Sequence, residues 1–152
     1  MEISAAKSEA AARCEIQPVL GKDIKAYWPK VKAGIEIILA KMKGTYDLLP
    51  EEVYVSLMRG FSFLYLIVLD GEVDGWMIFR KISDDFSQKP VMVVWLGTAE
   101  SSLGKELGIR EAEKLARERK FAKIRIYGRW GWERKPPQGW KVATVVLEKD
   151  LG

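Results

Sequence analysis

The sequence predicts a single α+β domain, an α/β sandwich in which three main helices flank a mixed, mostly antiparallel sheet of about six to seven strands. Apolar residues recur at helical spacing in some segments, while aromatic and β-branched residues crowd others, as is typical of strands. The chain has 152 residues, which suits one domain. We expect that domain to span residues 14–152, behind a flexible tail at 1–13 that is rich in Ala, Lys and Glu.

The first half of the domain is predicted to contain one strand, two helices and a hairpin. Segment 14–20 alternates apolar residues around a proline, which indicates a short strand at a sheet edge. Apolar residues at helical spacing predict helices at 28–44 and 48–60, each of which ends at a glycine. The aromatic and branched run at 61–69 is followed by the turn "DGEVDG" and a second such run at 75–82, which predicts an antiparallel pair.

The second half begins with a continuous apolar run at 91–97, which predicts a central strand buried on both faces. A helix is expected at 109–120 and a strand at 122–128. This strand–helix–strand unit is where the order of elements predicts a parallel crossover. A last strand is expected at 140–151.

Composition excludes several classes of site. Histidine is absent and Cys14 is the one cysteine of the chain, which removes His-dependent triads, zinc hydrolases and an intrachain disulfide. The aspartates show no metal-ligand spacing, and we expect no metal site. No apolar run approaches the roughly 18 residues that span a bilayer, and the N-terminus lacks the apolar core of a signal peptide. We therefore expect a cytoplasmic protein with no membrane partner.

Basic residues gather toward the C-terminus, although the net charge of the chain is a mild +4. Between positions 119 and 135, seven basic residues stand against one acidic residue. Such a patch suits an acidic protein surface, a phosphorylated cofactor or nucleic acid, and a solvated charged face is the alternative. No recognised nucleic-acid-binding module accompanies it. The candidate interaction residues are Arg125, Arg129, Trp130, Trp132, Arg134 and Lys135.

The order of elements over residues 14–151 resembles the GNAT fold of N-acetyltransferases. Several segments, among them "YWPKVKAGIEIILAK", "PEEVY" and "GRWGWER", further resemble a family of tailed-bacteriophage proteins with a GNAT-like fold. Proteins of that phage family are encoded among head and portal genes. The resemblance therefore implies a virion component of the head, portal or tail junction. It implies phage proteins as partners, a location in the host cytoplasm and the particle, and a homo-oligomeric ring if the partner is a portal.

Active GNAT enzymes bind the pyrophosphate of acetyl-CoA through a loop of pattern Gln/Arg-x-x-Gly-x-Gly/Ala, at the start of the following helix. The matching stretch here is "ESSLGKELG", in which the glycines are four residues apart and the Gln or Arg is missing. Its candidate cofactor-binding residues are Ser101, Ser102, Gly104, Lys105 and Gly108. The alternative is that Ser101 or Ser102 merely caps the helix and the glycines relieve crowding.

The resemblance also implies a general base for the amine and a tyrosine that protonates the leaving thiolate. Glu100 is the candidate base, with Glu72 and Asp74 as alternatives, and Tyr127 is the candidate tyrosine. In the family that tyrosine lies on a helix between the last two strands, where this chain has "WGWERKPP". We therefore interpret the chain as a catalytically degenerate GNAT-like protein that needs no cofactor. The alternative is an active enzyme that transfers acetyl from acetyl-CoA to a primary amine.

Overall fold

The computed structural model describes residues 12–42, 47–127, 138–143 and 147–152. Within these ranges the sheet contains five strands in the order β1-β2-β3-β4-β5, with antiparallel pairs up to β4 and a parallel β4–β5 pair. This is the predicted mixed, mostly antiparallel sheet with three helices. The elements in chain order are β1 (Cys14–Pro18), α2 (Gly21–Met42), α3 (Pro50–Met58), β2 (Ser62–Leu69), β3 (Glu72–Ser83), β4 (Pro90–Ala99), α4 (Ser102–Glu118) and β5 (Lys123–Ile126).

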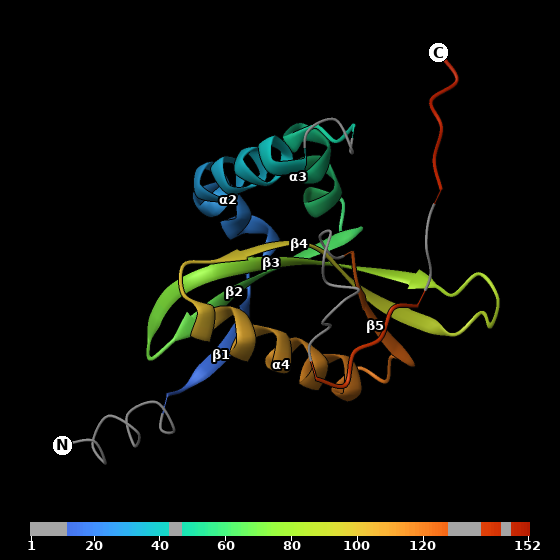
Figure 1. The fold of residues 1–152 in the computed structure, drawn as a ribbon. Helices are drawn as coiled ribbons and strands as arrows, with labels where there is room; N and C mark the ends of the chain where they lie inside the picture. Colours follow the sequence, from blue (N-terminus) through green and yellow to red (C-terminus); the bar gives the residue numbers. More distant parts are fainter. Residues whose placement is uncertain (1–11, 43–46, 128–137, 144–146) are drawn as a thin grey trace.

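Helices cover both faces of the sheet (Figure 1). On one face, α2 and α3 bury Ile35 and Val53 against alternate side chains of β2 and β3 such as Ile78. On the other face, α4 buries the small residues Ala112 and Ala116, which let the helix lie close to the strands. None of the helices in the described part of the chain is long and apolar enough to cross a membrane.

The β2–β3 hairpin forms where the sequence predicts it. Its two-residue turn is Asp70–Gly71, and both residues have positive φ angles of 50° and 83°. Aspartate and glycine tolerate that conformation, and turns of this kind match the twist of the flanking strands. β1 pairs with the outer edge of β2, from Cys14 opposite Leu69 to Pro18 opposite Tyr65. The predicted edge position of the first strand is therefore confirmed.

β4 is buried on both faces, as its continuous apolar run predicts. Met92 and Val94 belong to the apolar cluster under α4, whereas Val91 and Val93 point to the opposite face and are also buried. After α4 the chain returns as β5, which runs parallel to β4. The parallel strand–helix–strand unit is therefore confirmed.

Two helices begin seven residues earlier than the sequence predicts. α2 starts at Gly21 and contains Pro29, which leaves the carbonyl of Lys25 without a helical donor. Lys25 is exposed, and a carbonyl that solvent can reach does not need a partner within the helix. α4 starts at Ser102 because Ser101 caps it, its Oγ accepting a hydrogen bond from the N–H of Gly104 at 2.9 Å.

The described sheet has fewer strands than the predicted six to seven. Residues 138–143 and 147–152, which carry most of the expected last strand, adopt no strand pairing. Trp140 instead turns to α4, where its indole Nε1–H donates to Glu113 Oε1 at 2.7 Å. A side-chain contact with the helix thus replaces the expected backbone ladder at this point. Residues 1–11, Gly44 and the segment 128–137 lie outside the described residues.

Candidate functional site

The candidate site begins at the point where the pairing between β4 and β5 ends. The two strands pair from Val91 opposite Lys123 to Val94 opposite Ile126, and the next residue of β4, Trp95, is a β-bulge. On the β3 side, Ile78 lies opposite Leu96 and Phe79 opposite Val94, so Trp95 is the extra residue. Beyond the bulge, the β5-side edge of β4 has no strand partner in the described part of the chain. A free edge of this kind can pair with an extended chain.

A cavity of about 640 Å³ lies along this free edge. Its walls come from β4 between Trp95 and Ala99, the end of α2, the first turns of α4 and the end of β5. The volume is in the range of small-molecule sites, and the walls are mainly apolar, as such sites usually are. The charged and phenolic side chains among the described lining residues are Lys41, Asp47, Arg80, Lys105 and Tyr127.

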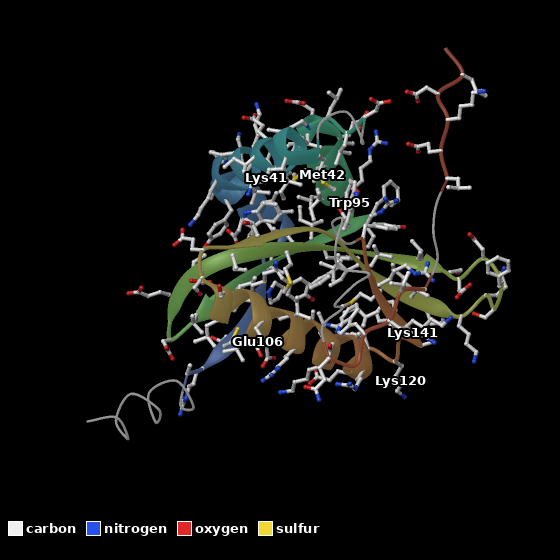
Figure 2. The ribbon with its side chains drawn as sticks, in the orientation of Figure 1. Lys41, Met42, Trp95, Glu106, Lys120 and Lys141 are labelled. Carbon is white, nitrogen blue, oxygen red and sulfur yellow. The ribbon has the colours of Figure 1, made fainter. Side chains whose placement is uncertain are left out.

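Arg80 and Trp95 form the wall on the α2 side. The guanidinium of Arg80 lies 4.7 Å from the centroid of the Trp95 ring, within cation–π distance. Figure 2 shows Trp95 on the side of the sheet that carries Lys41 and Met42 at the end of α2. Sequence reasoning missed these cleft residues, because the bulge that brings them together leaves no signal in the apolar run of β4.

The two predicted catalytic residues lie in different places. Tyr127 follows β5, is 52% exposed and lines the cavity. Glu100 is exposed on the loop after β4 and does not line the cavity; its N–H donates to the main-chain oxygen of Asp74 at 2.7 Å. Asp47, from the segment before α3, is a carboxylate that does line the cavity. The structure therefore brings Tyr127 and Asp47, rather than Tyr127 and Glu100, to one cleft.

The predicted cofactor-binding residues lie at the cap and in the first two turns of α4, not in an open loop. Ser101 is the N-cap, Ser102 is exposed, and Lys105 lines the cavity. Gly108 gives α4 a close approach to β2, because a Cβ there would lie 3.0 Å from Cδ1 of Ile67. The alternative interpretation of the sequence, a capped helix with glycines that relieve crowding, is the local structure observed.

A carboxylate occupies the neighbourhood of the cap. Asp74 Oδ2 accepts hydrogen bonds from Ser101 Oγ at 2.9 Å and from Ser101 N at 3.3 Å. A side chain at Gly104 would overlap this carboxylate, so glycine is required for Asp74 to pack there. A helix N-terminus favours anions, but here an internal anion already holds the donors of Ser101. The backbone and hydroxyl donors of Ser101 are therefore used within the chain.

Arg125 is the one member of the predicted interaction patch among the described residues. Its guanidinium lies 3.7 Å from Asp84 Oδ2, and its side chain is 26% exposed. Lys123 donates to the same oxygen at 2.9 Å. Two of the basic residues between positions 119 and 135 therefore pair with Asp84 in an ion cluster. The other five residues of the patch, Arg129, Trp130, Trp132, Arg134 and Lys135, lie outside the described residues.

Asp84 is the buried centre of this cluster. The residue is 5% exposed, and its Oδ1 accepts the N–H of Phe86 at 2.9 Å. The hydrogen bond from Phe86 N–H and that from Lys123 lower the pKa of Asp84 from 3.8 to about 2, against the opposing effect of desolvation. In the described ranges no three His, Cys, Asp or Glu side chains gather as metal ligands. The carboxylate of Asp84 accepts hydrogen bonds from Lys123 of β5 and from the backbone N–H of Phe86.

No protein-family model and no curated protein sequence matches the chain. Solved structures do match over most of its length. An aminoglycoside acetyltransferase from an uncultured soil metagenomic sample superposes with a TM-score of 0.60 and 16% identity, covering 91% of this chain and 97% of that one. A GNAT family acetyltransferase from Staphylococcus aureus gives a TM-score of 0.61 and 13% identity, covering 91% and 98%. The chain therefore has the fold of the GNAT acetyltransferases.

Proposed function

We propose that the chain uses its GNAT-like fold as a non-catalytic binding module and contacts a protein partner through the hairpin between β3 and β4. The observation that carries this proposal is Phe86, which is 98% exposed on a loop held from within by Asp84. The segments that resemble phage proteins support a partner in the head, portal or tail junction of a phage particle.

The hairpin loop has a defined conformation. Beside the Phe86 contact, the N–H of Asp84 donates to Lys89 O and the N–H of Gln88 donates to Asp84 O, both at 2.9 Å. Figure 1 shows this hairpin extending beyond the rest of the sheet. A loop that is ordered before binding loses little conformational entropy in a complex. Phe86 therefore has the properties of an aromatic anchor that enters a pocket of the partner.

The hairpin that carries this anchor also carries exposed cations. They are Lys81 and Lys89, whereas Lys123, which is brought beside the hairpin because Ala122 N donates to Pro90 O at 2.9 Å, pairs with Asp84. Asp84 is already neutralised by its own cations, which leaves Asp85 as an exposed carboxylate of the loop. The net positive charge suits a partner whose apolar pocket has an acidic rim.

The non-catalytic part of the proposal is supported at the other end of the sheet. Glu100 lies outside the cavity, and the first turn of α4 holds an internal carboxylate instead of a free anion cradle. A chain that had kept the reaction would need both the acyl donor and a base at the same cleft.

Mass spectrometry of purified particles of the phage that encodes the chain tests the partner role. We expect the chain to be present and Phe86→Ala to lower its amount about tenfold, as loss of an aromatic anchor does. Ile37→Ala, which removes another exposed apolar side chain from α2, is the matched control and is expected to change nothing. Absence of the wild-type chain from the particles contradicts the virion role. Equal incorporation of both variants contradicts the hairpin as the contact.

An acetyl-CoA-dependent N-acetyltransferase is the second candidate function. The observation that favours it is the cavity beside β4, which Tyr127 and Asp47 both line. Release of free thiol from acetyl-CoA in the presence of primary amines measures this activity. Turnover that Tyr127→Phe lowers, and that the control Tyr27→Phe does not, would establish the enzyme. No turnover across a saturating range of acetyl-CoA would exclude it.

A further inference from the structure

The turn that leads into α4 is held by Asp74 of β3 through three hydrogen bonds. Its carboxylate accepts from Ser101 Oγ at 2.9 Å and from Ser101 N at 3.3 Å, and its main-chain oxygen accepts from Glu100 N at 2.7 Å. These contacts use donors that a helix N-terminus otherwise offers to an anion.

The position of Asp74 is built into the fold. The next residue, Gly75, pairs with Ala99 of β4, and a Cβ at Gly75 would overlap the backbone of Thr98. The two strands therefore approach unusually closely just before α4 begins. On the helix side, Gly104 leaves the space that the Asp74 carboxylate fills. Glycine at 104 is thus explained by an internal carboxylate and not by the approach of a ligand.

The turn held by Asp74 adjoins the cavity. Ala99, the partner of Gly75, and Lys105 of α4 both line the cavity, whereas Asp74 and Ser101 are not among its lining residues. A ligand in the cavity whose anionic group extended to the N-terminus of α4 would meet Asp74 there. A diphosphate at that point would face a like charge and would find the Ser101 donors already used.

We propose that Asp74 is a specificity-determining residue that excludes diphosphate groups from the N-terminus of α4, and so reserves the cleft for extended ligands without phosphate. This role is separate from the proposed contact through the β3–β4 hairpin, and it names a class of ligand, the diphosphates, that the cleft beside β4 rejects. Of the two roles predicted for Gly104, this one agrees with relief of crowding, because the glycine leaves room for the Asp74 carboxylate.

Titration calorimetry at low ionic strength with sodium pyrophosphate as the probe tests the role of Asp74. Asp74→Asn keeps an oxygen acceptor for Ser101 and removes the charge, and we expect it to bind pyrophosphate at least tenfold more tightly than the wild type does. Asp70→Asn is the matched control, because it removes one charge from the β2–β3 turn, where Asp70 Oδ1 accepts from Arg13 N rather than from Ser101. An equal gain in both variants, or no gain in Asp74→Asn, overturns the proposal.

The wild-type chain provides a second measurement that does not depend on a variant that folds. CoA and pantetheine share the same arm, to which CoA adds a diphosphate and a 3′-phosphorylated adenosine. We expect CoA to bind the wild type no more tightly than pantetheine, and at least tenfold tighter binding of CoA overturns the proposal. Failure of the non-catalytic role would be seen separately, as turnover of acetyl-CoA, so the two outcomes remain distinguishable.

Discussion

Lys123 Nζ lies 2.9 Å from Asp84 Oδ2, and this contact ties the tip of the β3–β4 hairpin to the first residue of β5. The pKa of Asp84 is lowered to about 2 by the hydrogen bond from Phe86 N–H and by Lys123. The hairpin, its exposed Phe86 and the start of the parallel strand pair therefore depend on one ionised carboxylate.

The pH dependence of stability follows from that carboxylate. Because the pKa of Asp84 is lower in the folded than in the unfolded chain, its contribution is complete above the ordinary value of 3.8 and is lost as the pH falls toward about 2. Urea midpoints measured between about pH 5 and pH 2 are expected to fall less steeply for Asp84→Asn than for the wild type. Asp85→Asn, at the exposed neighbouring position, is the control and is expected to follow the wild type. Parallel curves for all three proteins contradict the assignment.

Gly34 is predicted to be required for the contact between α2 and the sheet. A Cβ at this position would lie 2.7 Å from Cζ2 of Trp76, which is buried. We expect Gly34→Ala to lower the free energy of unfolding by about 1–3 kcal/mol, even though alanine favours the helix. Gly21→Ala, in the same helix with open space around it, is expected to be neutral or slightly stabilising. Equal stability of the two variants in urea would show that the Trp76 ring can shift.

Gly104 and Asp74 are predicted to be energetically coupled. Gly104→Ala places a methyl group where the Asp74 carboxylate lies and is expected to cost about 1–3 kcal/mol. In an Asp74→Ala background the same substitution is expected to cost much less, since the space is then empty. A double-mutant cycle by urea denaturation measures the coupling. Additive effects of the two substitutions would mean that the carboxylate does not pack on this turn.

The contact between Trp140 and Glu113 is predicted to hold the C-terminal segment against α4. Trp140→Phe keeps an aromatic ring and removes the indole N–H that lies 2.7 Å from Glu113 Oε1. We expect a loss of about 1 kcal/mol of unfolding free energy, as for one partly exposed hydrogen bond. Glu113→Gln retains an oxygen acceptor and is expected to lose less. A Trp140→Phe variant as stable as the wild type would show that this hydrogen bond contributes nothing.

Most of the strands and helices could be predicted from local pattern. The hairpin of β2 and β3 follows from two branched and aromatic runs around Asp70–Gly71, and the burial of β4 follows from its unbroken apolar run. Helix starts were less predictable, because the apolar spacing that predicted the first helix began only at residue 28 and the glycines of α4 were interpreted as a loop. Both helices nevertheless form through these residues. In α2, Lys25 and Pro29 are exposed, and α4 is capped by Ser101.

The candidate site was predictable only in part. The segment 100–108 was singled out as the stretch that leads into the helix after β4, although most of it belongs to α4 itself, and Tyr127 was placed at the end of β5. The cavity between β4 and β5 depends on the bulge at Trp95, which no single residue type signals. The pairing of Asp74 with Ser101 joins positions 27 residues apart, so no local spacing reveals it.

The sequence by itself determined the α+β class, the order of the elements and the absence of histidine chemistry, because periodicity and composition are local properties of the chain. Only the tertiary structure decided what the glycines and carboxylates do. The sequence left two roles open for Gly104, a phosphate contact or relief of crowding, and the fold brings Asp74 to it from a neighbouring strand. A helix N-terminus stabilises a nearby anion, and in this fold the carboxylate that accepts from the cap residue Ser101 is one of the chain's own side chains.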